Sequence, residues 1–224
     1  MKSIIIIIPA KNPSDKIIEI CKKISPKCGK IIIINDGSNK NLNIFKNLRL
    51  IKNSTIIKNK ICRGKGYSIK KAVKFIIKQK IKCNGIITVD SDGQHCYQDI
   101  KKLIKKFQKK PNYILLGIRS FKFLNTPFWN FMGNKISAKI FKFFQKLDVP
   151  DTQCGLRAIP KKYFREMLEI PFDGFDFETA YLIKFLTKYS FKTISIKTIY
   201  ENEKSNFLKF YDSSKIINLL LFYK

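Results

Sequence analysis

The segment Ile86-Ile87-Thr88-Val89-Asp90-Ser91-Asp92-Gly93-Gln94-His95 places an apolar run directly before a polar cluster. A short β-branched run bounded by turn-forming residues is typical of a buried strand. Asp90 and Asp92 lie two residues apart, so their carboxylates point the same way in an extended chain. We therefore expect a buried strand that delivers two acidic side chains to its carboxyl end.

Similar apolar runs alternate with lysine-rich amphipathic stretches through the first half of the chain. The expected strands are Ile4–Ile8, Ile31–Ile34, Thr55–Ile57, Ile86–Val89 and Tyr113–Gly117. Helical spacing of apolar residues predicts helices at Asp15–Ile24, Gly66–Lys80 and Asp99–Gln108. Strands that are apolar on both faces and separated by helices indicate an α/β fold, a mostly parallel sheet with helices on both faces.

Polar clusters follow four of the expected strands. They are Pro9-Ala10-Lys11-Asn12, Asn35-Asp36-Gly37-Ser38, Asp90 to His95, and Gly117-Ile118-Arg119. Ligands of open parallel sheets bind beyond the carboxyl ends of the strands. We therefore expect these four segments to converge on one edge of the sheet and to form the binding site there.

The chain is strongly basic. Its 224 residues include 45 lysines and arginines against 16 acidic residues, a formal net charge of +29. Such a balance favours a polyanionic partner: nucleic acid, anionic lipid or a phosphorylated substrate. Biased codon usage is the alternative explanation, because 40 of the 45 basic residues are lysine.

The charge is most one-sided between Ile100 and Leu147, where eleven lysines and Arg119 face no acidic residue. From Phe121 to Leu147 the lysines interleave with aromatic residues, a composition that suits a lipid surface. Alternatively, the aromatic residues belong to the core and the lysines to a solvated face. Single-stranded nucleic acid uses the same residue types, but arginine is scarce and no nucleic-acid motif is found. We therefore expect no nucleic-acid partner.

The six cysteines include no C-x-x-C pair, which argues against a zinc knuckle. The apolar run Ile4–Ile8 is too short for a secretory signal and ends in Pro9. No apolar stretch reaches the roughly 20 residues that span a bilayer. We expect a cytoplasmic protein that lies peripherally on the inner face of the membrane.

Asp90, Asp92 and Gln94 are the candidate metal ligands. Gly93 allows the backbone to turn, and Gln94 adds a neutral oxygen to the two carboxylates. Oxygen ligands suit Mg²⁺ or Mn²⁺, and such an ion neutralises a diphosphate leaving group. A D-x-D pair alone often marks a solvated turn, but its place after a buried strand favours the metal. His95, the only histidine, either contacts phosphate or metal or hydrogen-bonds within its loop.

Taken in order, these segments resemble the family 2 glycosyltransferases, particularly the branch of dolichyl-phosphate mannose synthase and other polyprenyl-phosphate glycosyltransferases. Besides the four strand-end clusters, the matching segments are Arg63-Gly64-Lys65-Gly66, Asp151-Thr152-Gln153-Cys154-Gly155-Leu156-Arg157, Phe177-Glu178-Thr179 and Tyr200-Glu201…Lys204-Ser205-Asn206-Phe207. The resemblance implies a GT-A fold in a single domain, residues 1–224. Residues 1–120 would bind the nucleotide sugar, and residues 121–224 would form the acceptor side.

By position, the resemblance implies the donor contacts. Asp36 would hydrogen-bond the nucleobase, Pro9 and Ala10 would line its pocket through their backbone, and Asp90 would hold the ribose or the metal. Asp92 and Gln94 would hold the metal. The remaining nucleotide-sugar contacts would come from Asn12, Arg63, Lys65 and Ser91.

Four basic residues are candidates for phosphate binding. Arg63 and Lys65 lie in a glycine-flanked loop before a helix, where backbone N–H groups and the helix N-terminus favour phosphate; a plain turn is the alternative. Arg119 and Arg157 resemble phosphate clamps, since arginine binds phosphate through a fork of donors. A structural ion pair is the alternative for either arginine.

Several features depart from the family pattern. Lys11 stands where many relatives have tyrosine, and Asn35 where they often have aspartate, but neither change removes a metal ligand. Many polyprenyl-phosphate enzymes carry C-terminal membrane helices, whereas the apolar run 216–223 is too short to span a bilayer. We expect that run to lie on a membrane or to pack on the domain.

The leading hypothesis is inverting transfer of a hexose to a polyprenyl phosphate. Its oxygen is already anionic, so catalysis would rest on positioning and on stabilisation of charge by Asp92 with its metal and by the two arginines. The alternative acceptor is a sugar hydroxyl in glycan assembly, which needs a general base; Asp176 and Glu178 are the candidates, unless they merely favour a helix N-terminus. A third hypothesis, a non-catalytic basic module that binds membrane or nucleic acid, leaves the strand-end motifs as coincidence.

Overall fold

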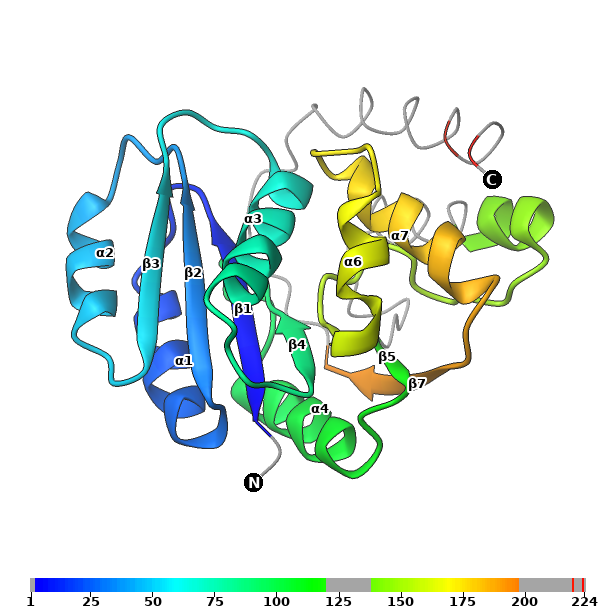
Figure 1. The fold of residues 1–224 in the computed structure, drawn as a ribbon, viewed down its shortest axis with the longest axis horizontal. Helices are drawn as coiled ribbons and strands as arrows, with labels where there is room; N and C mark the ends of the chain where they lie inside the picture. Colours follow the sequence, from blue (N-terminus) through cyan, green and yellow to red (C-terminus); the bar gives the residue numbers. More distant parts are fainter. Residues whose placement is uncertain (1–2, 120–137, 198–218, 220–222, 224) are drawn as a thin grey trace.

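The computed structural model of the chain describes residues 3–119, 138–197, 219 and 223. These residues form an α/β fold with a seven-stranded sheet in the order β3-β2-β1-β4-β6-β5-β7 (Figure 1). The strands are β1 Ile4–Ala10, β2 Lys30–Asp36, β3 Ser54–Asn59, β4 Gly85–Thr88, β5 Ile114–Arg119, β6 Arg157–Pro160 and β7 Phe191–Ile196. The helices are α1 Lys16–Ile24, α2 Leu42–Arg49, α3 Lys65–Lys78, α4 Tyr97–Lys109, α6 Phe164–Leu168 and α7 Asp176–Leu186, with short 3₁₀ turns η1 Ser25–Lys27 and η3 Lys161–Tyr163. Residues 138–145 are also helical.

The sheet is mostly parallel, as predicted. β2 pairs with β1 and β3, β1 with β4, and β5 with β7, all in parallel. β6 runs antiparallel to both of its neighbours, β4 and β5. Its first residue, Arg157, is in register with Thr88 on one side and Leu116 on the other. The loop before β6 therefore arrives beside the end of β4, two residues before Asp90.

Two apolar layers enclose the sheet, because successive side chains of a strand point to opposite faces. Ile5 and Ile7 of β1 belong to the cluster that includes residues of α3, α6 and α7. Ile4, Ile6 and Ile8 belong to the cluster that includes residues of α1, α2 and α4. This arrangement confirms the prediction of helices on both faces.

The second half of the chain holds the elements that periodicity did not predict: β6, α6, α7 and β7. β6 is only four residues long and ends in Pro160, and α7 is buried on nearly all sides, so neither shows a clear period. In the first half, α2 was also missed. It is eight residues long, and Asn41 before it has a left-handed backbone with φ of +56°.

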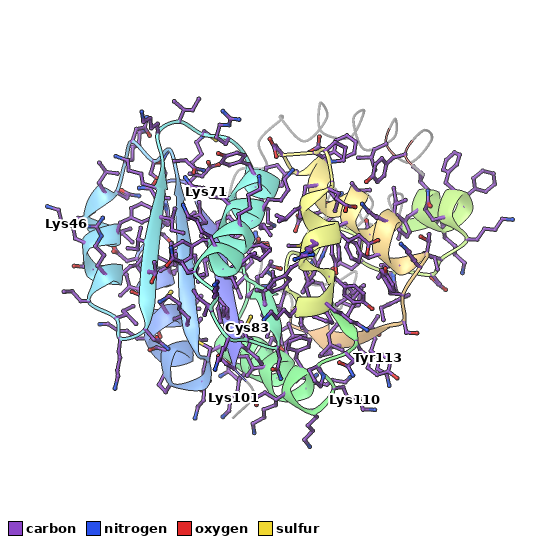
Figure 2. The ribbon with its side chains drawn as sticks, viewed as in Figure 1. Lys46, Lys71, Cys83, Lys101, Lys110 and Tyr113 are labelled. Atoms are coloured by element: carbon purple, nitrogen blue, oxygen red, sulfur yellow. The ribbon has the colours of Figure 1, made fainter. Side chains whose placement is uncertain are left out.

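The basic, aromatic segment is described only from residue 138 onward; Phe121–Phe131 lies outside the described residues. Phe141 is buried in the core, whereas Phe143 and Phe144 are 79% and 41% exposed and form an edge-to-face pair. The core alternative therefore holds for Phe141, whereas contact of the segment with lipid stays a prediction. Elsewhere exposed lysines such as Lys46 and Lys110 lie at the periphery of the fold (Figure 2).

Two residues near the end of the chain pack on the domain. Leu219 is buried in the cluster of α3, α6 and α7, and the ring of Tyr223 lies 5.2 Å from that of Phe172. Of the two expectations for the apolar run 216–223, packing on the domain is the one these contacts support. Among the described residues, no helix has the length and the apolar character needed to cross a bilayer.

Candidate active site

The loops after β1 and β2 are joined by Asn12. Its backbone N–H donates to Ser38 Oγ over 2.9 Å, and its Oδ1 accepts from the N–H groups of Asn39 and Lys40 at 3.0 Å each. Two of the four predicted polar clusters are therefore in direct contact. Asn12 thus links the two loops by hydrogen bonds, and its contact with a nucleotide sugar stays a prediction.

Asp36 lies at the end of β2 and is almost fully buried. It accepts hydrogen bonds from Asn59 Nδ2 at 2.7 Å and from the N–H groups of Arg63 and Gly64 at 2.9 Å each. Burial opposes ionisation of this carboxyl, but the hydrogen bonds outweigh it, so its pKa is lowered. Asp36 thus organises the loop before α3. Its contact with a nucleobase stays a prediction.

The first turn of α3 packs on the segment before α7. The N–H of Gly66 donates to Gly174 O at 3.2 Å, and the N–H of Tyr67 donates to Asp173 O at 2.9 Å. Gly64 adopts φ of +103°, and a Cβ there would lie 2.4 Å from Asp173 O. Together with the bonds to Asp36, these contacts occupy the backbone donors that were expected to bind phosphate. These four N–H groups are therefore engaged within the protein, and phosphate binding by Arg63 and Lys65 stays a prediction.

Lys65 lies between two carboxylates. Its Nζ is 2.5 Å from Asp90 Oδ1 and 3.0 Å from Glu178 Oε1, and its side chain is 11% exposed. His95 Nε2 lies 3.1 Å from the other oxygen of Asp90. Burial disfavours the charged form of both Lys65 and Asp90, but the neighbouring charges outweigh this effect. Asp90 and Glu178 raise the pKa of Lys65, and Lys65 and His95 lower the pKa of Asp90. Both groups are therefore ionised at neutral pH.

Gly155 closes over this ion pair. A Cβ at this position would lie 2.4 and 2.6 Å from the two carboxylate oxygens of Asp90 and 2.6 Å from Lys65 Nζ. Thr88 Oγ1 donates to Gly155 O at 2.7 Å and holds the loop against the end of β4. Only glycine leaves room for the pair. Gly155 belongs to a motif quoted above, but no pattern in the sequence indicated that it would lie against Asp90.

Asp92 lies at the surface next to this cluster. Its Oδ1 accepts the N–H of Gln94 at 2.9 Å, and Gly93 makes the turn with φ of +82°. Desolvation by the surrounding protein and the negative charge of Asp90 raise the pKa of Asp92. The second of these causes is repulsion between the two carboxylates, which a cation placed between them would remove.

The donor set fits a hard divalent cation. Asp90, Asp92 and Glu178 carry three negative charges against the one positive charge of Lys65, and the candidate ligands are all oxygens. In the described part of the chain no three His, Cys, Asp or Glu residues are grouped to hold a metal. Asp90, Asp92 and Gln94 would therefore need water or substrate oxygens to complete the shell, as Mg²⁺ commonly does.

The two candidate phosphate clamps are engaged within the protein. Arg119 forms a two-point ion pair with Asp151, which is the structural alternative left open by the sequence. Arg157 is buried, and its guanidinium donates to three backbone carbonyls, those of Thr152, Cys154 and Glu178, at 2.9 to 3.0 Å. A phosphate contact by Arg157 would require these bonds to break. For both arginines the clamp stays a prediction that this structure does not favour.

The two candidate bases lie in the first turn of α7. Asp176 Oδ1 accepts the N–H of Phe177 at 3.0 Å, so Asp176 satisfies the helix N-terminus. Glu178 is buried and paired with Lys65. Three further candidates stay predictions: Pro9 and Ser91 are partly exposed, and Ala10 is buried at the end of β1. Arg63 is exposed, with its guanidinium 4.8 Å from the centre of the Tyr67 ring.

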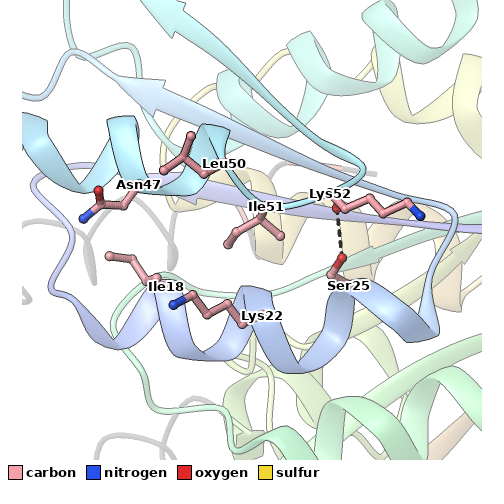
Figure 3. A pocket seen from close by; sticks show the side chains of 7 residues that line it. All are labelled: Ile18, Lys22, Ser25, Asn47, Leu50, Ile51 and Lys52. Carbon is pink, nitrogen blue, oxygen red and sulfur yellow. Dashed lines mark hydrogen bonds between the residues drawn. The ribbon is translucent and has the colours of Figure 1, made fainter.

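A separate groove lies between α1 and α2 (Figure 3). Its volume is about 660 Å³, and it shares no residue with the cluster around Asp90. Its lining residues are Ile18, Lys22, Ser25, Asn47, Leu50, Ile51 and Lys52. The lining contains no carboxylate, so the groove does not fit a metal site.

The geometry around Asp90 and the fold agree with a known family. A sequence model described as glycosyl transferase family 2 matches residues 5–168. The chain belongs to this family. It is therefore a glycosyltransferase, and the finer assignment to the polyprenyl-phosphate branch is a separate proposal.

Two sequence relatives come from Methanocaldococcus jannaschii, both described as uncharacterized proteins. This glycosyltransferase is 30% identical to one over 177 residues, which cover 73% of this chain and 74% of that protein. It is 27% identical to the other over 206 residues, which cover 88% of this chain and 82% of that protein.

Solved structures with the same fold include two sugar phosphoglycerate synthases. Glucosyl-3-phosphoglycerate synthase from Mycobacterium tuberculosis, in complex with Mn²⁺, UDP-glucose and phosphoglyceric acid, matches with a TM-score of 0.65 and 13% identity over 98% of this chain and 78% of that one. Mannosyl-3-phosphoglycerate synthase from Rubrobacter xylanophilus matches with a TM-score of 0.68 and 10% identity, over 98% and 72%. At such identities the likeness concerns the fold, and it confirms the GT-A architecture.

Proposed function

We propose that this glycosyltransferase transfers a hexose from a nucleotide sugar, with inversion and with Mg²⁺ or Mn²⁺, to the phosphate of a polyprenyl phosphate. The observation that carries the acceptor is the state of Glu178 and Asp176. Lys65 pairs with Glu178, and Asp176 accepts a hydrogen bond at the start of α7. A hydroxyl acceptor needs a base to take its proton, whereas a phosphate oxygen is already anionic. A site in which both candidate bases are already engaged therefore suits a phosphate acceptor.

The donor side supports the nucleotide sugar and the metal. Asp90, Asp92 and Gln94 would hold the cation, which when bound supplies Lewis-acid stabilisation of the diphosphate leaving group. Lys65 and His95 keep the Asp90 carboxylate ionised and oriented. The mycobacterial synthase of the same fold binds Mn²⁺ and UDP-glucose, which supports a divalent cation and a nucleotide-sugar donor.

We further propose that residues 1–224 form one domain, in which residues 1–120 hold the donor and residues 121–224 receive the acceptor. The enzyme would lie peripherally on the inner face of the membrane, where a polyprenyl phosphate resides. The exposed pair Phe143 and Phe144, next to Lys142 and Lys146, supports contact with lipid.

Product analysis tests the proposal. UDP- and GDP-hexoses are supplied with Mn²⁺ and with either a short polyprenyl phosphate or an oligosaccharide, and the anomeric configuration of the product is determined. We expect a β-linked lipid phosphate sugar from an α-linked donor, and little product on the oligosaccharide. Efficient transfer to the oligosaccharide alone would favour the hydroxyl acceptor, and no metal-dependent binding of any nucleotide sugar would contradict the whole proposal.

Variants at the candidate bases add a second test. If Glu178 or Asp176 were the general base, its amide variant would lose about 10²–10⁴-fold in turnover at unchanged donor binding. We expect a smaller loss for Glu178→Gln and Asp176→Asn. Glu166→Gln is the matched control, because Glu166 pairs with Lys188 and Tyr189, away from Lys65.

A further inference from the structure

Lys65 occupies an unfavourable place for a cation. It is the first residue of α3, where the positive end of the helix dipole repels it, and burial removes most of its hydration. Asp90 and Glu178 compensate for both costs by contacting the same Nζ. Asp90 follows β4, and Glu178 lies in the first turn of α7. A single ammonium group thus joins the metal side of the site to the acceptor side.

The backbone around Lys65 joins the same regions. The two N–H groups before it, at Arg63 and Gly64, donate to Asp36 at the end of β2. The two N–H groups after it donate to the carbonyls of residues 173–174, directly before α7. Within five residues the chain therefore contacts three parts of the site, and its two glycines leave no room for a side chain.

We propose that Lys65 is a positioning residue that couples the donor side of the site, at Asp90, to the acceptor side, at Glu178 and the first turn of α7. Because one ammonium group holds both carboxylates, a change that displaces Lys65 loosens both of them. Lys65 would thereby keep the two sides in the mutual alignment that glycosyl transfer requires. This role goes beyond the proposed function, because it holds for any sugar and any acceptor.

Amide hydrogen exchange of the full-length, ligand-free protein tests the coupling without a substrate. Glu178→Gln weakens the hold on Lys65, so we expect exchange at residues 90–95, across the site, to accelerate about fivefold. In the Lys65→Met background the same change at Glu178 should leave residues 90–95 unaffected. Glu166→Gln, on the same side as Glu178 but outside the pair, should not alter residues 90–95 in either background.

Steady-state kinetics supply the second readout. Lys65→Met should lower kcat about tenfold or more while the donor KM stays within about threefold. Lys65→Arg should recover only part of kcat, because it restores the positive charge but the close packing at Gly155 leaves little room for the larger guanidinium group. Lys74→Met is the control, since Lys74 is exposed on the outer face of the same helix.

Three outcomes would overturn the coupling. The first is unchanged hydrogen exchange at residues 90–95 in Glu178→Gln. The second is an effect of Glu178→Gln on that exchange that is just as large in the Lys65→Met background. The third is wild-type kcat in Lys65→Met. If Lys65→Met does not fold, Glu178→Gln and Lys65→Arg still decide the question. A loss of coupling with intact metal-dependent activity would count against Lys65 alone, whereas absent activity with intact coupling would count against the proposed function.

Discussion

Arg119 and Asp151 form a two-point ion pair beside the candidate site. Arg119 Nε lies 2.7 Å from Oδ2 of Asp151 and Nη2 lies 2.9 Å from Oδ1, and the Asp151 side chain is 0% exposed. The backbone N–H of Arg119 also donates to the same carboxylate at 3.1 Å. Arg119 ends β5, and Asp151 opens the loop that closes over Asp90. The pair therefore fixes the position of that loop.

Removing the positive charge of this pair should destabilise the protein. Arg119→Met leaves Asp151 buried without its cation, which costs about 3–5 kcal/mol in comparable buried pairs. Denaturant unfolding at neutral pH measures the loss, and Arg165→Met is the control because Arg165 is exposed. If Arg119 instead binds donor phosphate, Arg119→Met will weaken nucleotide binding with little change in stability.

Gly155→Ala should reduce activity more than stability. The added methyl group would meet both Asp90 oxygens and Lys65 Nζ at 2.4 to 2.6 Å, so the ion pair must separate or the loop must move. Because a misplacement of about 1 Å in an active site can cost about 10²-fold in rate, we expect a kcat loss of that order.

Gly29→Ala is the matched control for this change. Its methyl group would meet mainly the hydroxyl oxygen of Ser3, which can rotate away, far from Asp90. Turnover and thermal unfolding are measured for both variants. Wild-type turnover in Gly155→Ala would show that the close approach of this loop has no part in catalysis.

The first half of the fold could be predicted from the sequence because each of its strands is a short apolar run. Five short apolar runs, most of them rich in β-branched residues, predicted β1 to β5, and the structure confirms each of them. The second half lacks such a clear pattern of apolar residues. α7 is buried from Phe177 to Ala180 and β6 fits between two strands, so tertiary packing determines both.

The candidate site was predicted in its parts but not in its connections. The clusters at Asn12 and Asp36 do converge at one edge, because parallel strands place their carboxyl ends together. The partners of Lys65 were not predictable, because Asp90 and Glu178 are brought together only by the long-range packing of α3 on α7. For the same reason Arg157 was expected to grip phosphate, although in the fold its donors meet three backbone carbonyls.

Asp36 should make stability depend on pH in acid. Its folded-state pKa is lowered below that of the unfolded chain, so its contribution is present above the unfolded value, about 3.9, and is lost as pH falls through the folded value. Asp36→Asn should cost about 1–3 kcal/mol at pH 7, because three donors lose a charged acceptor. The difference from wild type should shrink towards pH 3 in urea unfolding. Asp148→Asn, at an exposed pair with Lys142, should show no comparable trend, and a gap that stays constant with pH would contradict the role of the ionised carboxylate.

Asp92 is the ligand whose loss should separate metal binding from folding. It is exposed, and its Oδ1 accepts the N–H of Gln94 within its own turn, so Asp92→Asn should leave stability almost unchanged. We expect Mn²⁺ affinity, measured by calorimetry or by electron paramagnetic resonance, to fall about 10–100-fold, because a carboxylate ligand becomes a neutral amide. Asp148→Asn again serves as the control. Unaltered Mn²⁺ affinity in Asp92→Asn would place the metal elsewhere.

Binding to anionic vesicles tests the lipid-facing surface. Phe143 and Phe144 are exposed beside lysines, so replacing both by serine should weaken binding to phosphatidylglycerol vesicles about tenfold, since each buried aromatic ring contributes apolar area. Leu50→Ser is a stringent control, because Leu50 is 84% exposed but lies in the groove between α1 and α2 (Figure 3). Binding by the net charge of +29 alone would behave differently. It would vanish at high salt, as screened electrostatic attraction does, and would not distinguish the phenylalanine pair from Leu50. An equal loss in both variants would therefore contradict a defined membrane face at Phe143 and Phe144.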